Sequence, residues 1–219
     1  MAFDWDVIWR NKYLFLGGLS VTLKLFVLAL AGGLPLGIIL GLGSLSSRRW
    51  LYYPTRAYVN FIRNIPLILV VFWVYFSLPL ISGRSLGPFT SAVVAFVIFE
   101  ATYFCEIIRA GFQSVSKGQI QSAYSTGLTY FQMVRYVLIP IAIRRVIPSL
   151  LTQGIVILQD TSLAYVIGLR EFVRTAAIVD SREVRPLELY SFVAIVFLVL
   201  CLVGSLVVRR LEARDRQRV

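Results

Sequence analysis

Histidine is absent from this chain of 219 residues, cysteine occurs only twice, and charged residues make up only 15% of the sequence. Without histidine, a metal-ligand cluster or a nucleophile–base pair, the sequence gives least support to an enzyme. Cys105 and Cys201 lie far apart in apolar segments, so we expect both to pack, and predict neither a disulfide nor a metal site. The phosphate-binding pattern G-x-x-x-x-G-K-S/T is also missing, so the chain should not bind ATP itself.

Acidic residues are scarce beside basic ones: 22 Lys and Arg stand against 11 Asp and Glu, a formal net charge of +11. A nucleic acid could explain such a charge, but the basic residues cluster in the connections between apolar segments. If these segments cross a membrane, the richest clusters lie on one side, which the positive-inside rule makes cytoplasmic, with the N-terminus outside. We therefore expect anionic lipid, and no nucleic acid, as the partner of this charge. The clusters contain Arg48, Arg49, Arg56, Lys117, Arg135, Arg144, Arg145, Arg209 and Arg210.

Apolar sequence is what the chain has in excess, since 58% of its residues are hydrophobic, against about 45–50% in soluble domains. About 20 consecutive apolar residues cross a bilayer as a helix. The sequence therefore predicts an all-α integral membrane protein with about five transmembrane helices in a single domain, residues 1–219. The expected spans are about Leu14–Ser44, Ala57–Leu80, Pro88–Gly111, Ile147–Gly168 and Leu189–Val208.

Charged residues inside these spans have different expected roles. Glu106 and Arg109 are three positions apart on one helix face, which favours a structural ion pair. Arg63 lies about two turns inside the second span, just before Pro66, where the missing backbone donor predicts a kink or half-break. Arg63 either reaches lipid phosphates or, with Asn64, faces a transport pathway.

Two carboxylates inside the spans are stronger candidates for a substrate pathway. Glu100 has no basic partner one turn away, and Asp160 falls near the middle of the fourth span. A carboxylate at that depth costs about 3 kcal/mol unless it faces water, a partner or a ligand. Ser149, Gln153 and Asp160 lie at helical spacing on one face, and Thr161 follows directly. A satisfied structural carboxylate is the alternative for both acids.

A polar stretch at residues 119–140 separates the third and fourth spans. Ile120–Thr126 and Thr129–Leu138 can be helical, with Gly127 as the turn between them. A short helix of this kind, parallel to the membrane, could present its backbone and small side chains to a groove in a soluble partner.

This stretch resembles the EAA loop of bacterial ABC importer permeases, whose pattern is Glu-Ala-Ala, three residues, Gly, nine residues, then Ile-x-Leu-Pro. The spacing is kept, with Val137, Ile139 and Pro140 at the end, although Gln replaces Glu and Ser replaces the first Ala. The departure from Glu implies a contact made by shape and backbone more than by charge. The resemblance assigns coupling to an ATPase to Gln121, Ser122, Ala123, Gly127, Leu128 and Pro140.

Nearly the whole chain, residues 14–210, shares the resemblance. The segments RNIPLILVVFWVYF, FEATYFCEIIRAGFQSVSKGQ and TQGIVILQDTSLAYVIG are similar to polar amino acid permeases of the histidine, glutamine and glutamate type. The last two most resemble glutamate/aspartate permease subunits. The resemblance implies a type I ABC permease fold with a coupling loop at residues 113–140.

The resemblance also implies partners and a location. Two copies of a separate ATP-binding subunit would hold ATP and Mg²⁺, a second permease, identical or different, would complete the pathway, and a periplasmic solute-binding protein would deliver the substrate. The chain itself would hold no cofactor, metal or catalytic residue. It would lie in the bacterial inner membrane with its N-terminus periplasmic and its C-terminus cytoplasmic.

Three other interpretations stay open. An ion-driven secondary transporter would usually have internal repeats and more helices, and it would leave the loop unexplained. A structural membrane protein would leave Glu100 and Asp160 without a role. An ABC permease for another polar amino acid fits the same residues as a glutamate/aspartate permease.

Overall fold

The computed structural model describes residues 4–84 and 86–216, and its secondary structure within those ranges is entirely helical. Four helical stretches are long and apolar enough to cross a membrane, and a bent helix pair can supply a fifth crossing. The prediction of an all-α membrane protein with about five spans is thereby confirmed. The spans are Lys12–Ser44, Pro88–Gln113, Tyr130–Ile167 and Pro186–Leu211, with the pair Arg49–Arg63 and Leu67–Ile81.

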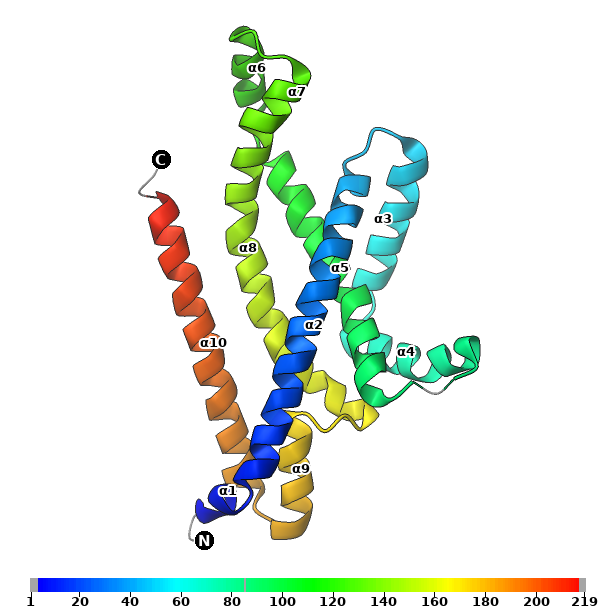
Figure 1. Cartoon of the computed structure of the whole chain (residues 1–219), viewed down its shortest axis with the longest axis vertical. Helices are drawn as coiled ribbons and strands as arrows, with labels where there is room; N and C mark the ends of the chain where they lie inside the picture. Colours follow the sequence, from blue (N-terminus) through cyan, green and yellow to red (C-terminus); the bar gives the residue numbers. More distant parts are fainter. Residues whose placement is uncertain (1–3, 85, 217–219) are drawn as a thin grey trace.

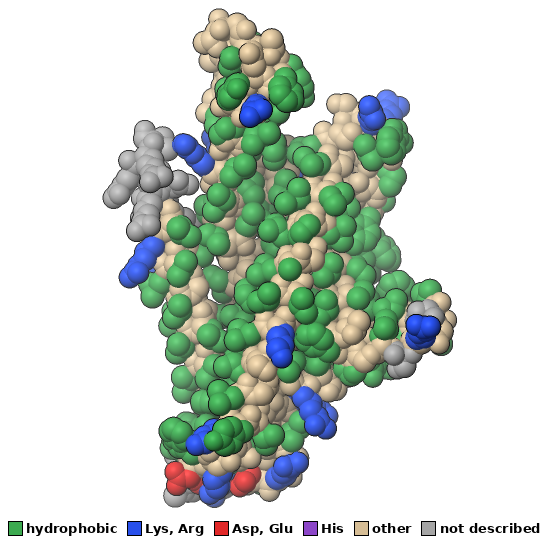
Figure 2. All heavy atoms as spheres, viewed as in Figure 1, with side chains coloured by type: hydrophobic (Ala, Val, Ile, Leu, Met, Phe, Trp, Pro, Cys, Tyr) green, Lys and Arg blue, Asp and Glu red, His purple; other side chains and the backbone are tan. Residues whose placement is uncertain are grey.

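The long helices run along one axis of the molecule (Figure 1). The N-terminus lies at one end, and the short helices α6 (Lys117–Ser125) and α7 (Tyr130–Met133) lie at the other, which we call the loop end. On the face in Figure 2, hydrophobic side chains cover the middle, and acidic side chains are visible only at the N-terminal end. The long helices are α2 (Lys12–Ser44), α5 (Pro88–Gln113), α8 (Ile139–Asp160) and α10 (Pro186–Arg216).

Helix α2 packs closely on α5 through a stripe of glycines, Gly33, Gly37 and Gly41, all buried. A Cβ atom at Gly37 would lie 2.4 Å from the Cβ of Phe104 and 3.0 Å from the Ala101 carbonyl oxygen. Small residues are needed because the two backbones approach each other at this point. The glycine-rich half of the first span is therefore a packing face.

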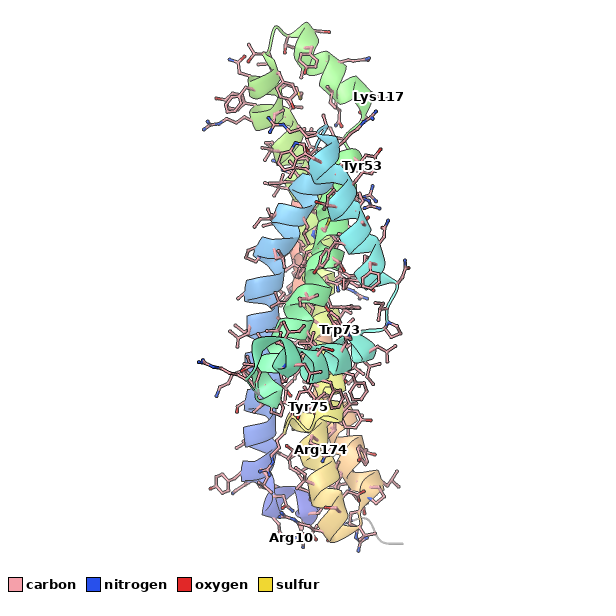
Figure 3. All side chains as sticks on the ribbon, turned by 90° about the vertical axis from the view of Figure 1, so that its right-hand side faces the viewer. Arg10, Tyr53, Trp73, Tyr75, Lys117 and Arg174 are labelled. Atoms are coloured by element: carbon pink, nitrogen blue, oxygen red, sulfur yellow. The ribbon has the colours of Figure 1, made fainter. Side chains whose placement is uncertain are left out.

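The second span is broken where proline predicts a break. Helix α3 (Arg49–Arg63) has Asn64 as its C-cap, and Pro66 has an extended backbone. Helix α4 (Leu67–Ser82) then begins, and the axes of α3 and α4 are bent by 104° relative to each other. Helix α4 therefore lies across the long axis of the molecule in both ribbon views (Figures 1 and 3). The predicted start at Ala57 was too late, because α3 already begins at Arg49.

The fourth span also begins earlier than predicted. A five-residue π-helix, η1 (Val134–Leu138), joins α7 to α8, and the 3-10 helix η2 (Thr161–Ile167) continues beyond α8. The prediction of Ile147 as the start was wrong, because the helical stretch already runs from Tyr130 to Ile167, with Pro140 directly after the π-helical turn.

The N-terminal end has its own small core, in which α1 (Asp6–Arg10), α9 (Phe172–Glu183) and α10 meet. Phe15 packs edge-on against Phe172, and the buried Thr22 hydroxyl accepts a hydrogen bond from the Phe172 amide at 3.1 Å. Glu171 caps α9 by accepting hydrogen bonds from the amides of Val173 and Arg174, at 2.8 and 2.6 Å. Burial raises the pKa of this carboxyl to about 7, although the two backbone bonds oppose the shift.

Candidate functional site

The loop end is built from two short, well-capped helices. At the start of α6, the Ser116 hydroxyl accepts from the Gln119 amide, and the Gln119 side chain accepts from the Ser116 amide, both at 3.2 Å. Thr129 and Gln132 form the same reciprocal cap at the start of α7. Gly127 lies between the helices with φ +80°, a conformation that favours glycine. The predicted pair of helices with a glycine turn is therefore present.

The proposed coupling residues lie on or beside α6. Ala123 is buried beneath the helix, Gln121 and Ser122 are exposed, and Leu128 is half-buried. Pro140 is exposed at the start of α8, below the loop. The loop thus presents small polar side chains on a helix that its own buried alanine holds in place. Figure 3 shows Lys117, the first residue of α6, toward the loop end and Arg10 at the opposite end.

Sequence reasoning missed a set of aromatic residues at the loop end. Tyr130 and Phe131 are 71% and 70% exposed, and Tyr124 and Tyr136 are also exposed. Exposed aromatic side chains that gather in one region are typical of a protein contact surface. Their signal in the sequence was the presence of four aromatic residues within an otherwise polar loop.

Among the described residues, the buried carboxylate of Glu100 has a single polar partner, which comes from another helix. Its Oε2 accepts a hydrogen bond from Gln153 Nε2 of α8 at 2.9 Å, and its Oε1 is buried with no partner within the described residues. On the other side, a Cβ atom at Gly33 of α2 would lie 3.3 Å from the Cβ of Glu100. Glu100 therefore sits where α2, α5 and α8 meet, with one oxygen available to accept hydrogen bonds.

Asp160 lies at the last residue of α8 and is partly exposed. It lies seven residues beyond Gln153 on the same helix, about two helical turns. The C-terminal end of a helix disfavours an anion, so the helix itself gains nothing from Asp160. Thr161 is buried, and its hydroxyl donates to the Leu158 carbonyl oxygen at 2.6 Å. The structure thus brings Glu100 and Gln153 together between α5 and α8, with Asp160 about 10 Å further along α8.

A second carboxylate on α5, Glu106, is surrounded by arginines. Its predicted ion pair with Arg109 is confirmed, with Nη2 to Oε2 at 2.6 Å. Arg56 of α3 also donates a hydrogen bond to Glu106. Arg63 adds an ion pair at 3.8 Å, and its guanidinium lies 4.9 Å from the centre of the Tyr103 ring. Arg63 is therefore held by neighbours in its own chain, and the lipid alternative is not needed to explain it.

A helical bundle with acidic side chains buried between apolar spans has the architecture of a membrane transport protein. The comparison with protein families is more specific. Residues 33–217 match the model described as "Binding-protein-dependent transport system inner membrane component", and the chain belongs to this family.

Curated relatives and solved structures agree with the family. The glutamate/aspartate import permease protein GltK of Escherichia coli O6:H1 is 41% identical over 97% of this chain and 98% of its own length. The glutamine transport system permease protein GlnP of Escherichia coli strain K12 is 36% identical over 98% of both chains.

Among solved structures, an amino acid ABC transporter crystallised with histidines matches with a TM-score of 0.92 and 34% identity, over 98% of this chain and 100% of that one. The inward-facing MetNI methionine transporter, at 21% identity over 92% of this chain and 98% of that one, has a TM-score of 0.68 and supports the type I permease fold alone. This chain is thus a permease of an amino acid ABC importer. Such permeases are not themselves enzymes.

Proposed function

We propose that the chain imports acidic amino acids, glutamate or aspartate, in an ATP-driven importer. The observation that carries this proposal is the carboxylate of Glu100, which is fully buried and has one oxygen without a partner in the described part of the chain. A buried carboxylate in this state favours a ligand that donates hydrogen bonds and carries positive charge. The α-ammonium group of an amino acid is such a ligand, and the charge of nearby Asp160 would strengthen the attraction.

The preference for an acidic substrate is supported by the basic surroundings of the neighbouring region. Arg63 lies three residues before the break at Pro66, on the side of the bundle that also holds Arg56 and Arg109 around Glu106. A planar guanidinium binds carboxylates through two parallel hydrogen bonds. In this proposal, Arg63 attracts the substrate carboxylate, Asn64 lies beside it, and Thr161 supports the position of Asp160.

The loop end is the proposed contact with the ATP-binding subunits, of which two copies would serve two permeases. ATP and Mg²⁺ would be bound there and not by this chain. Closure of the nucleotide-binding subunits would push α6, and the continuous helix that follows it would carry the movement to Gln153 and Asp160. The exposed tyrosines and Phe131 suit a groove in the ATP-binding subunit that recognises the loop by its shape. Such a contact needs no acidic residue at the position of Gln121.

The proposed orientation puts the loop end in the cytoplasm and the N-terminus in the periplasm. There, the charged N-terminal end, with Arg10 bound to Asp4 and Glu183, would receive a periplasmic solute-binding protein. A second permease, identical or different, would complete the pathway.

Uptake by the reconstituted complex tests the substrate. The chain, its ATP-binding subunits and the binding protein are placed in liposomes, and labelled L-glutamate uptake is followed with and without ATP. We expect uptake that requires ATP and that unlabelled L-aspartate inhibits. Uptake driven by an ion gradient without the ATP-binding subunits would overturn the proposal. Glutamine is the second candidate because of the similarity to GlnP, and preferential uptake of L-glutamine would favour it.

A pair of glycine variants tests the coupling loop. Gly127→Val places a branched side chain at φ +80°, so we expect it to distort the turn, leave ATP hydrolysis running and abolish uptake. Gly118→Val is the matched control, because that glycine lies in the same loop within regular helix, where a Cβ atom would make only an ordinary contact of 3.9 Å with Ser116 Oγ. Full uptake by the Gly127→Val complex would exclude the loop assignment.

A further inference from the structure

A cavity of about 410 Å³ lies beside the arginine cluster, where α3, α5 and α8 meet. Arg63 lines it from α3, Glu106 and Ser114 from α5 and its end, and Arg145 and Ser149 from α8. Since α8 begins at the loop end, Arg145 and Ser149 lie nearer to that end than Gln153 does. The cavity thus lies on the side of the Glu100 site toward the proposed coupling loop, and it contains Arg63, the residue that the proposed function assigns to the substrate carboxylate.

The walls of this cavity carry more positive than negative charge. Glu106 is the one acidic residue among the described residues that line it. Its two oxygens already bind Arg56 and Arg109 by hydrogen bonds. Arg63 approaches it only to 3.8 Å, an ion-pair distance that is too long for a hydrogen bond. The single carboxylate therefore cannot neutralise the arginines that surround it.

Arg145 keeps donors available on the opposite wall. Its Nη1 donates to the carbonyl oxygen of Ser114, and also to the Ser114 hydroxyl at 3.0 Å. A guanidinium has five N–H donors, so Nε and Nη2 can still reach a ligand. Ser149 lies one turn further along α8, and its hydroxyl is exposed toward the same cavity. An arginine on each wall and a hydroxyl between them match the acceptors of a carboxylate.

We propose that this cavity is a second binding site, specific for the side-chain carboxylate of an acidic amino acid. As a station in transport it rests on the proposed function, because it would receive the substrate after the Glu100 site. Ser149 precedes Gln153 by one helical turn, about 6 Å, and Asp160 by about 16 Å. On this pathway, the ammonium group of the substrate would first meet the protein carboxylates of the Glu100 site. The carboxylate of the substrate would then meet the guanidinium groups of the cavity.

Glutarate separates the two sites, because it has both carboxylates of glutamate but no ammonium group. Binding of labelled glutarate is measured by equilibrium dialysis on the complete complex in nanodiscs. We expect saturable binding that Ser149→Asp weakens at least tenfold, because a new negative charge faces the ligand. Ser149→Asn has nearly the same shape as Ser149→Asp but no charge, and its amide can still donate a hydrogen bond, so it should bind glutarate at least tenfold more tightly than Ser149→Asp. Asp160→Asn should also leave glutarate binding unchanged.

Arg145→Gln should weaken glutarate binding about tenfold, the effect expected for one hydrogen bond to a charged group. Arg144→Gln is its control, because Arg144 is exposed on the same helix and does not line the cavity. Thermal unfolding of the complex checks that loss of the Arg145 bonds to Ser114 has not unfolded it.

The proposal is overturned if glutarate does not bind saturably, or if Ser149→Asp and Ser149→Asn bind it equally. Equal displacement of glutarate by inorganic phosphate would also overturn it, by showing a general anion or lipid headgroup site. The proposed function fails separately. A complex that binds glutarate as described, yet imports glutamine and no glutamate, would support the second site and exclude an acidic substrate. ATP-driven glutamate uptake without glutarate binding would support the acidic substrate and exclude the second site.

Discussion

Two glutamates on helix α5, six residues apart, have opposite surroundings. Glu106 is bound by Arg109, with the Arg56 and Arg63 guanidinium groups also against it. Glu100 is more deeply buried, yet its one polar partner among the described residues is the neutral amide of Gln153. A carboxylate between arginines holds helices together, whereas a buried carboxylate with a free oxygen is poorly satisfied by its own protein. The difference suggests that Glu106 serves the fold and Glu100 serves a ligand.

Removal of the Glu106 charge should have the largest effect on stability. Glu106→Gln leaves three arginines facing one another without their carboxylate, and because the group is only partly buried the loss should cost about 1–3 kcal/mol. We expect a large fall in the unfolding temperature of the complex. The matched control is Glu183→Gln, because Glu183 pairs with Arg10 at 3.3 Å on the surface, where such pairs contribute about 0–1 kcal/mol. Equal effects of both substitutions on the unfolding temperature would contradict the structural role of Glu106.

Glu171 extends the comparison to a buried carboxylate outside the spans. Burial raises its pKa to about 7 in the folded chain, so folding favours the protonated form. Its contribution to stability is full below about pH 4.5 and is lost progressively as the pH rises to about 7. The change is at most about 3 kcal/mol. Unfolding temperatures at pH 5 and pH 8 measure it, and the chain contains no histidine to titrate between them.

The control for this pH dependence is Glu171→Gln. An amide keeps the shape of the side chain and one acceptor oxygen for the backbone amides of the cap, and it does not titrate in this range. We expect this variant to lose much of the difference between pH 5 and pH 8. An unchanged pH profile would show that other groups cause the effect.

Hydropathy and proline were enough to predict the spans and the break near Pro66. They were not enough to predict the 104° angle, because the missing amide donor says where a helix stops and not where the next one goes. The direction of α4 depends on its packing against α5 and η2, and these contacts join distant parts of the chain. The start of α8 was predicted too late because Arg144 and Arg145 interrupt the apolar run. The helix itself continues through these two residues.

Predictions about the sites succeeded where the partners were close in sequence. The pair Glu106–Arg109 followed from its spacing along one helix. Gln153 stands 53 residues from Glu100, and Arg56 stands 50 residues from Glu106. These contacts depend on how helices cross, which a single sequence does not state. The depth of Glu100 marked it as a candidate, but the protein's failure to satisfy both its oxygens is visible only in the fold.

Neutralising Glu100 should impair transport while leaving stability nearly intact, the reverse of Glu106→Gln. Glu100→Gln keeps a side chain of the same shape beside Gln153 but removes the charge that attracts an ammonium group. We expect ATP-driven uptake of the amino acid to fall at least tenfold, equivalent to about 1.4 kcal/mol. The unfolding temperature should change little. Full uptake by this variant would assign Glu100 to structure alone.

Gln153 offers the smallest and most selective test of the same comparison. Gln153→Leu removes the 2.9 Å hydrogen bond to Glu100 Oε2, the one polar contact of this carboxylate among the described residues, so stability should fall by about 1 kcal/mol. Gln159→Leu makes the same chemical change at an exposed position of α8 and should have less effect. If Gln153 acts by orienting Glu100, the substitution should have little further effect on uptake once Glu100→Gln is present, which a double-mutant cycle measures. Fully additive effects on uptake would mean that Gln153 meets the substrate independently of Glu100.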